Sequence, residues 1–355
     1  MAGNALQILG LGASTPIGRN VWASAAAARA GVCGFSEHPY MVDTAGEPMR
    51  IARAPWLDVG LDGAARLSAL LLPAIEEALT PLTELGENVS PHIGLALALP
   101  PPRPGQPDGL ADGVLEAIRE RMGDRFTRIA RFEVGHAAGH MAIAAAEAGC
   151  ARGAFDACVV AGADSYLAPE TLEWVEACDQ LHGGGPLNNP WGFIPGEAAG
   201  AVLFGTPHLA QLCGIAPLGE LVSVGIGIEP RLIKTGEVCV GEGLTQAFRA
   251  ALQALPPGEQ VHNVFCDLNG EAYRADEFGF AALRTGERFR AASDFIAPAD
   301  CWGDVGAAGS SLHIALAVIA SYKRYDKGPL SMVWASSESG ERGAVLLCGT
   351  GGMGD

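Results

Sequence analysis

The sequence predicts a layered α/β fold, and three observations support this prediction. Short apolar runs bounded by glycine alternate with longer stretches in which apolar residues recur every three or four positions. The composition, with 49% hydrophobic and 18% charged residues, is typical of a globular protein that buries aliphatic surface. The length of 355 residues fits two domains of roughly 150 residues each, or one large duplicated fold.

The expected strands are the short apolar runs, which begin with LQILGL near the N-terminus and fall into an early and a late set. Runs of this length, bounded by glycine and polar residues, are typical of strands buried in the middle of a layered fold. They cover residues 6–11, 92–99, 157–161, 199–204, 221–226, 262–267, 331–335 and 343–348.

The expected helices lie between these strands, where apolar residues recur at helical spacing. Pro73 lies inside the first of them. Because proline removes a backbone hydrogen bond and clashes with the preceding turn, we expect a kink or an early break there. The helices cover residues 64–79, 113–122, 136–151, 244–255, 276–284 and 306–322.

The chain divides best near Gln211. The stretch PPPRPGQPDG (100–109) is too rich in proline and glycine for regular structure, and we interpret it as a loop within a domain. A division after GTPHLAQ leaves an N-terminal half, 1–211, and a C-terminal half, 212–355, each with its own strands and helices. No repeat is detectable residue by residue, so only the similar order of elements suggests a duplication.

The charge balance excludes some classes of partner. With 23 Lys and Arg against 40 Asp and Glu, the formal net charge is −17, which repels nucleic acid and anionic membranes. No apolar run reaches the roughly 18 residues of a membrane span, and the N-terminus does not resemble a signal peptide. The nine cysteines are scattered and form no CxxC pair, which indicates buried thiols in a reducing compartment. We therefore expect a cytoplasmic protein.

A metal site has little support in the sequence. His136 and His140 are four residues apart and could share one helix face, but no third ligand cluster accompanies them. We expect neither a metal nor a cofactor.

Four segments carry a resemblance to a known family. They are 8–35 (ILGLGAS…), 134–166 (VGHAAGHMAIA…), 188–204 (NNPWGFIPGEAAGAVLF) and 304–318 (DVGAAGSSLHIALAV). In this order and spacing they resemble the β-ketoacyl-acyl-carrier-protein synthases (3-oxoacyl synthases) of the thiolase-like superfamily. The resemblance implies a five-layered αβαβα fold of two pseudo-duplicated halves, with the active site where the halves meet. It also implies a homodimer or heterodimer that acts on acyl-carrier-protein or acyl-CoA thioesters in fatty-acid or polyketide synthesis.

Members of this family use a cysteine at a helix N-terminus and two histidines. The cysteine thiolate accepts the acyl group, and the histidines assist decarboxylation and stabilise the oxyanion. The resemblance places His136 at the nucleophile position, so the cysteine is missing. Cys150 would lie about 21 Å further along the helix, and Cys158 falls in the next expected strand, so neither replaces it.

The two histidine positions also differ from the family. The first histidine turn is best matched by DLNGEA, which places Asp267 at the histidine and leaves Asn269 and Gly270 as substrate-binding positions. The second is matched through GAAG, which places Gly303 or Asp304 there. The carboxylate of Asp267 would repel the malonyl group and the oxyanion, unless burial keeps it protonated. Neither Gly303, which is a third candidate substrate-binding position, nor Asp304 restores the histidine donor.

The family's flexible, phenylalanine-containing gate corresponds to ASSESGERGAVLL (335–347). That stretch has no phenylalanine, and Glu338, Glu341 and Arg342 lie within it. Three catalytic positions and the gate therefore all depart from the family pattern.

Each candidate residue also has a structural interpretation. His136 could simply start a helix and bond to a backbone carbonyl. Asp267 could cap a helix or pair with Arg274. Asp304 precedes the helix that begins near Gly306 and could serve as its N-cap.

Other residues are interpreted as structural. Glu197, in the PGEAAG turn, shapes the fold in the family that this segment resembles. Gly10, Gly12 and Gly18 are not spaced as GxGxxG, and the resemblance explains them as turn and packing glycines.

Three hypotheses follow. The leading one is a ketosynthase-like protein without cysteine-dependent condensation, which binds acyl groups or pairs with a catalytic homologue. The alternative is an acyltransferase or thioester hydrolase that uses His136 with Asp267 or Asp304 as a general base, if they lie within ~3 Å. The third is an assembly protein whose old pocket is filled by side chains. A basic patch could dock an acidic acyl-carrier protein, and it comprises Arg119, Arg121, Arg125 and Arg128.

Overall fold

The computed structural model describes residues 5–83, 90–233 and 235–351. The strands are β1 (Gln7–Ser14), β2 (Phe35–Val42), β3 (Pro48–Ala52), β4 (Ile93–Ala98), β5 (Arg128–Phe132), β6 (Ala157–Ser165), β7 (Glu197–Gly205), β8 (Gly219–Ile228), β9 (Asn263–Cys266), β10 (Phe295–Ile296), β11 (Leu330–Ser336) and β12 (Glu341–Gly349). The α-helices are α1 (Val21–Arg29), α2 (Gly63–Leu79), α3 (Leu110–Met122), α4 (Ala138–Ala151), α5 (Pro169–Ala177), α6 (Pro207–Cys213), α7 (Glu242–Leu252), α8 (Ala272–Thr285), α9 (Ala299–Trp302) and α10 (Gly309–Tyr322). Five 3-10 turns accompany them: η1 (Thr80–Leu82), η2 (Gly123–Arg125), η3 (Gly135–Ala137), η4 (Gly286–Arg288) and η5 (Gly306–Ala308).

The main sheet consists of two halves with the same topology. Within the described residues it has ten strands in the order β10-β9-β11-β12-β8-β1-β7-β6-β4-β5. From the junction outwards, the first half runs β1-β7-β6-β4-β5 with two antiparallel pairings and then two parallel ones. The second half, β8-β12-β11-β9-β10, repeats this pattern. This shared pattern supports the duplication that the order of elements suggested.

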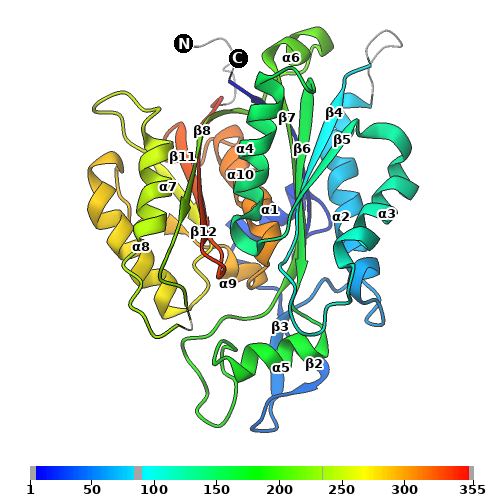
Figure 1. Cartoon of the computed structure of the whole chain (residues 1–355), viewed down its shortest axis with the longest axis vertical. Coiled ribbons are helices and arrows are strands. Elements are labelled where there is room, and N and C mark those ends of the chain that lie inside the picture. Colours follow the sequence, from blue (N-terminus) through cyan, green and yellow to red (C-terminus); the bar gives the residue numbers. More distant parts are fainter. Residues whose placement is uncertain (1–4, 84–89, 234, 352–355) are drawn as a thin grey trace.

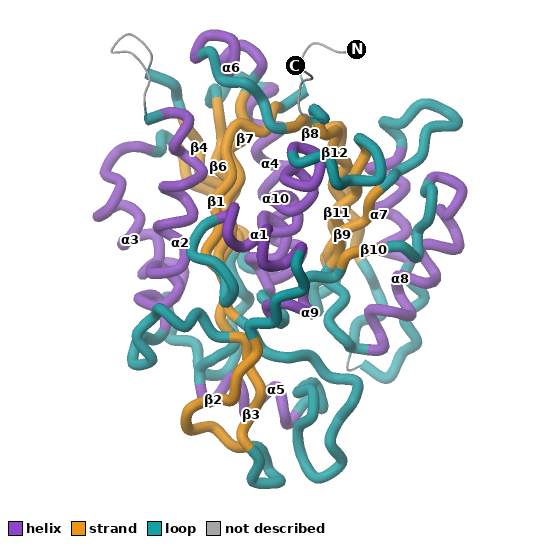
Figure 2. The backbone as a smooth tube through the Cα atoms, turned by 180° about the vertical axis from the view of Figure 1, so that it is seen from behind, coloured by secondary structure: helices purple, strands orange, loops and turns teal. Residues whose placement is uncertain are grey.

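Helices fill the layers on both sides of the half-sheets. Helices α4 and α10 pack against each other in the middle, α2 and α3 cover the outer face of the first half, and α7 and α8 that of the second (Figure 1). Separate apolar core clusters lie between the two half-sheets and on the outer face of each, and the central one contains most of α10. The view from behind shows the β2–β3 hairpin and α5 projecting beyond these layers (Figure 2). The arrangement is the five-layered αβαβα fold expected from the sequence.

The two halves meet through few sheet hydrogen bonds. Strands β1 and β8 pair only at Gln7 with Glu220 and at Ile8 with Gly219. The boundary expected between residues 211 and 212 falls inside α6, the helix that precedes the second half. The division of the chain into two domains at that boundary stays a prediction.

All the expected strands and helices are present, although several others were not expected. The hairpin β2–β3, the edge strand β5 and the helices α5 and α6 are too short or too polar to stand out in the sequence. The break expected at Pro73 is wrong, because α2 runs without interruption to Leu79. Packing of α2 against β1, β6 and β7 compensates for the missing hydrogen bond.

The cysteines are less buried than expected. Cys150, Cys158, Cys266 and Cys301 are buried, Cys33 is exposed, and the others are half-buried. None of the described helices is both long and apolar enough to cross a lipid bilayer.

Glu197 has the structural role expected for it. It is fully buried at the start of β7. Its two carboxylate oxygens accept hydrogen bonds from Nε and Nη2 of Arg66 at 2.6 and 2.8 Å. It also accepts the backbone N–H of Ala54 at 2.9 Å. This bidentate ion pair ties α2 to the strand that it covers.

Two glycines of β1 allow α2 to pack directly on the sheet. A Cβ atom on Gly10 or Gly12 would overlap the carbonyl oxygens of Ala78 and Ala74 in α2. These are therefore packing glycines, as the sequence suggested, and their lack of a side chain sets the distance between the helix and the strand.

Replacing Gly12 with alanine is expected to lower the free energy of unfolding by about 1–3 kcal/mol, because the backbone of α2 must move. Gly279→Ala is the matched control, since a Cβ there meets nothing within 4 Å in the middle of α8. We expect that variant to gain up to about 1 kcal/mol through better helix propensity. Urea unfolding followed by circular dichroism measures both changes, and a neutral Gly12→Ala would contradict the packing argument.

Candidate functional site

The candidate site lies where two equivalent turns of the two halves meet. Turn η3 leads into α4 and turn η5 leads into α10, and the two turns are in contact. Each begins with a glycine in the left-handed region, Gly135 at φ 75° and Gly306 at φ 47°. Such φ values favour glycine, because other residues rarely adopt them. His136 lies on η3, and Asp304 lies just before η5.

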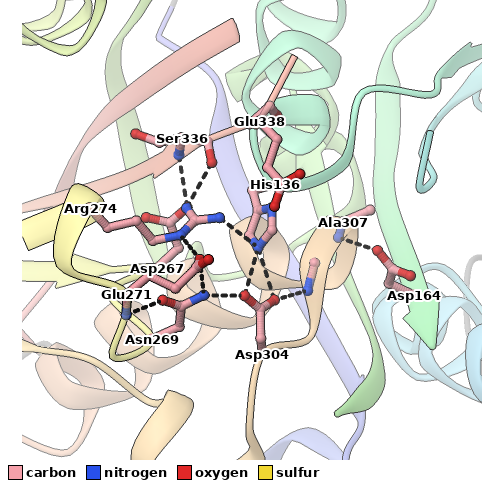
Figure 3. Close-up of polar contacts among 12 residues, drawn as sticks. His136, Asp164, Asp267, Asn269, Glu271, Arg274, Asp304, Ala307, Ser336 and Glu338 are labelled. Atoms are coloured by element: carbon pink, nitrogen blue, oxygen red, sulfur yellow. Dashed lines mark hydrogen bonds and ion pairs between the residues drawn. The ribbon is translucent and has the colours of Figure 1, made fainter. Parts of the chain in front are cut away.

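His136 and Asp304 form a buried pair (Figure 3). The Nε2 atom of His136 is 2.8 and 3.0 Å from the two carboxylate oxygens of Asp304. The side chains are 8% and 3% exposed. Asp304 also accepts the backbone N–H of Gly306, the first residue of η5, at 2.8 Å, although the N-cap position itself is Val305 rather than Asp304.

The electrostatics favour the charged form of both partners. Burial disfavours the imidazolium, but the Asp304 carboxylate outweighs it and raises the pKa of His136 above 6.5, against an opposing effect of Arg274. Burial also disfavours the Asp304 carboxylate, but His136 and Arg274 hold the pKa of Asp304 well below 3.8. The proton therefore resides on Nε2, between the ring and the carboxylate.

Arg274 lies at the centre of the site. Its guanidinium is 1% exposed and donates to Asp267 Oδ2 at 2.8 Å, to Glu271 Oε2 at 3.1 Å and to the carbonyl oxygen of Ser336 at 2.8 Å. Its Nη2 lies 3.4 Å from Nε2 of His136. Since Nε2 carries a proton, this is an approach of two cationic groups, which the surrounding carboxylates stabilise.

Two amide side chains, those of Asn269 and Gln180, donate hydrogen bonds to the carboxylates of the site. The amide nitrogen of Asn269 donates to Asp304 at 2.6 Å and to Glu271 at 2.9 Å. The amide nitrogen of Gln180 donates to Glu271 at 2.7 Å and to Glu338 at 2.6 Å. The amide group of Asn269, a candidate substrate-binding residue, therefore makes hydrogen bonds to side chains of the protein itself.

Gly270 and Gly303, two of the candidate site residues, lie in loops beside this network and have backbone conformations that favour glycine. Gly270 has φ 109° and Gly303 has φ 73°. A Cβ on Gly270 would approach the carbonyl oxygen of Gly192, and one on Gly303 would approach that of Ile194. Both glycines allow the segment 192–194 to pack closely against the site.

Little empty space remains at the centre. The cavity lined by His136, Asp267, Asn269, Gly303 and Asp304 has a volume of about 20 Å³. This volume suits roughly one water molecule. The side chain of His313 also lines it, and within the described residues His313 Nδ1 and Asp267 Oδ1 have no hydrogen-bond partner.

The gate segment forms a tight hairpin between β11 and β12. The hydroxyl of Ser337 accepts the backbone N–H of Ala137 at 2.8 Å, which ties the hairpin to η3. Arg342 is 2% exposed and pairs with the buried Glu277 of α8. Ion pairs and hydrogen bonds therefore attach this segment to the body of the protein.

The rings of His136 and His140 have different hydrogen-bond partners and do not point toward a shared metal position. The ring of His140 lies between the hydroxyl of Ser310 at 2.8 Å and the carbonyl oxygen of Val333 at 3.2 Å. Within the described residues, the one group of three possible metal ligands close enough to share an ion comprises Glu229, Cys239 and Glu277, which lie outside this site. Arg342 already pairs with Glu277 there.

Sequence reasoning found the centre of this site but not all of it. The structure brings together His136, Asp304 and Asn269, and it places Asp267 beside Arg274, as the structural interpretation of Asp267 expected. Gln180 was missed, because nothing in its local sequence distinguishes it. Glu271 was missed too, although a carboxylate three residues before Arg274 on a helix is a detectable signal.

Comparisons with known proteins establish the fold. No protein-family model and no curated protein matches the sequence. Among solved structures, this chain is similar to a chain in the structure of the AntDE:AntF assembly. That structure is described as a type II PKS acyl-carrier protein in complex with its ketosynthase bound to the hexaketide. The TM-score is 0.80, with 15% identity over 98% of this chain and 100% of that one.

Two further structures agree. The ishigamide ketosynthase/chain length factor matches with a TM-score of 0.70 and 19% identity, over 97% of this chain and 99% of that one. A β-ketoacyl synthase from Burkholderia phymatum STM815 matches with a TM-score of 0.72 and 15% identity, over 98% and 100% of the chains. These likenesses confirm the thiolase-like ketosynthase fold expected from the sequence.

Proposed function

We propose that this chain is a ketosynthase-like protein of fatty-acid or polyketide type that lacks cysteine-dependent condensation and acts as the partner of a catalytic homologue. The observation that carries the proposal is the buried ionic network of His136, Asp304 and Arg274. It occupies the place where the resemblance puts a nucleophilic cysteine and two catalytic histidines.

The space at the centre supports this proposal. A thioester carbonyl with its two substituents needs several times the 20 Å³ that the side chains leave. Moving the carboxylates that line the cavity would require Asp267 to leave the buried Arg274, and Asp304 to leave His136. Breaking such contacts is strongly unfavourable.

The protonation state of His136 supports it as well. An acyl acceptor needs a lone pair on the attacking nitrogen, but Nε2 holds a proton against Asp304. The nearby carboxylates of Asp267 and Asp304 would also destabilise an oxyanion. The groups at the centre thus favour a folded, charge-balanced core over acyl transfer.

A partner subunit would have an edge on which to dock. Strand β5 lies at one end of the sheet and pairs with β4 on one side. Its other side offers backbone donors and acceptors to a strand from another chain. Two of the similar structures are described as assemblies with a carrier protein or a chain length factor, which agrees with a partner role.

Docking of an acidic acyl-carrier protein forms part of the proposal. The arginine patch lies at the end of α3 and the start of β5. Arg121 pairs with Glu76 at 2.7 Å, and Arg125 donates to the carbonyl oxygen of Leu82 at 3.4 Å. These contacts hold two of its side chains in place at the surface.

The second candidate function is a thioester hydrolase that uses His136 with Asp304. The 2.8 Å contact favours it, because a general base needs a partner within hydrogen-bonding reach. Asp267 does not serve as that partner in the structure, since it is bound to Arg274 and to the backbone N–H of Ser336.

Intact mass spectrometry separates the two functions. We expect no acyl adduct and no turnover when the purified protein meets acetyl-CoA, malonyl-CoA or acyl-carrier-protein thioesters, because the pocket is filled. His136→Gln is the matched variant, since glutamine can still donate to Asp304. Turnover that disappears in His136→Gln would refute the leading proposal and support the hydrolase.

Co-expression tests the partner role. The chain is produced with a cysteine-containing ketosynthase homologue encoded in the same genome, and complexes are isolated by size-exclusion chromatography. We expect an equimolar complex that elongates acyl chains with malonyl-carrier protein only when the partner keeps its cysteine. Elongation by this chain alone would overturn the proposal.

A further inference from the structure

A second and larger cavity lies away from the site already described. It has a volume of about 300 Å³ and opens between the β2–β3 hairpin, the start of α2, the loop before α3 and the start of α5. None of its lining residues lines the small cavity at His136. Its volume is at the lower end of the range typical of small-molecule sites.

The floor of this cavity contains a hydrogen-bond donor without a partner. His38 is 6% exposed, and its Nδ1 accepts the backbone N–H groups of Met41 at 3.0 Å and Tyr40 at 3.4 Å. The ring proton therefore resides on Nε2. Nε2 makes no hydrogen bond with any residue in the described part of the chain. Because His38 lines the cavity, this N–H is free to donate to a ligand that enters it.

Positive charge faces this imidazole. Burial lowers the pKa of His38, and the cations of Arg53 and Arg66 lower it further. Arg66 is already bound to Glu197 and to two backbone carbonyls. Arg53 is half-buried and lines the cavity, with one guanidinium N–H donated to the carbonyl oxygen of Leu57 at 3.3 Å. Among the described residues the rest of its guanidinium has no other acceptor, so it can donate to a ligand.

The other lining residues of the cavity favour a ligand that carries a single negative charge and has an apolar body. Leu61, Leu67 and Leu167 provide aliphatic surface. Asp62 and Glu170 are exposed at the rim, where their carboxylates would repel a dianion. An ammonium group on the floor would face the two arginines.

We propose that this cavity binds a monocarboxylate with a short aliphatic body. The carboxylate accepts from Nε2 of His38 and from the guanidinium of Arg53, and the aliphatic chain lies against Leu67 and Leu167. This site is independent of the function proposed for the His136 network.

Isothermal titration calorimetry with sodium hexanoate tests the site on the whole chain. We expect a dissociation constant below about 1 mM, which is reasonable for a ligand of this size. Arg53→Met keeps the aliphatic stem and removes the charge. His38→Asn keeps an acceptor for the N–H of Met41 and removes the Nε2 donor. We expect each variant to bind at least tenfold more weakly, and the exposed Arg50→Met of the same hairpin to bind as the parent does.

Several outcomes would overturn the proposal. They are no binding at 10 mM hexanoate, equal binding by Arg53→Met, and equal affinity for hexylamine or for inorganic phosphate. If His38→Asn does not fold, Arg53→Met alone decides the result. The failure of this site would leave the acyl-transfer and partner experiments unaffected, because they address other residues.

Discussion

Replacing Arg274 with leucine is expected to lower the free energy of unfolding by about 3–5 kcal/mol. The guanidinium is 1% exposed and holds Asp267 at 2.8 Å and Glu271 at 3.1 Å. Without it, these buried carboxylates face each other and Asp304 with less positive charge among them. The carbonyl oxygen of Ser336 also loses a donor. Urea unfolding at neutral pH measures the change.

The matched control is Arg121→Leu, which breaks an ion pair whose side chains are 61% and 44% exposed. We expect a far smaller effect there, because water solvates both charges in either state. Adding Asp267→Asn to Arg274→Leu should restore part of the lost stability. An Arg274→Leu variant as stable as the parent protein would show that the network contributes little to folding.

Acid is expected to unfold the protein because of two buried histidines. His140 and His313 are 0% and 3% exposed and lie between α4, α10 and the second half-sheet. Burial lowers the pKa of each to about 4, from 6.5. His140 donates from Nε2 to the carbonyl oxygen of Val333, and its lowered pKa keeps the ring neutral in the folded protein at neutral pH. Each ring must be protonated on unfolding in acid.

The sign of the effect follows from linkage. Between pH 6.5 and 4 the unfolded chain binds protons that the folded protein does not, so stability falls as the pH falls. Each histidine contributes about 3 kcal/mol to this loss over that range. We expect His313→Leu to lose about half of the slope of stability against pH, as measured by urea unfolding at several pH values. The control His208→Gln changes an exposed histidine and should keep the full slope.

His136 contributes with the opposite sign, and Asp304 contributes with the same sign but in stronger acid. The raised pKa of His136 gives stability that is present below pH 6.5 and is lost as the pH rises through its folded pKa. The lowered pKa of Asp304 gives stability that is present above pH 3.8 and is lost in stronger acid. His136→Gln should therefore flatten the alkaline side of the stability curve. A His136→Gln variant that retained the parent's alkaline slope would contradict the charged pair.

The filled centre gives weight to the third hypothesis as well as to the first. A cavity of about 20 Å³ agrees with an assembly role, whereas a site for an acyl chain would need an open apolar tunnel. A partner subunit and an assembly protein share this feature. The co-expression experiment separates the two hypotheses. The elongation activity of a ketosynthase depends on this chain if the chain is a partner subunit, and does not depend on it if the chain is an assembly protein.

The sequence by itself determined the layered α/β architecture. Strand runs, helical periodicity and the packing glycines Gly10 and Gly12 are local patterns, and local patterns follow from the geometry of strands and helices. The four segments that resemble ketosynthases were sufficient to expect five layers and the halves that meet at the site. The contact of Asp304 with the first N–H of η5 and the pairing of Asp267 with Arg274 were also within reach, because the partners are two and seven residues apart.

Only the tertiary structure decided what fills the site. His136 and Asp304 are 168 residues apart, and Gln180 lies 158 residues from Glu338. Whether such side chains meet depends on strand order and on how closely the halves pack, and neither is encoded in a local pattern. The same reason explains the break wrongly expected at Pro73, since propensity describes an isolated helix while packing on the sheet holds α2 together. Burial also sets the protonation states of these groups, because low polarity strengthens the interactions between paired charges and disfavours unpaired ones.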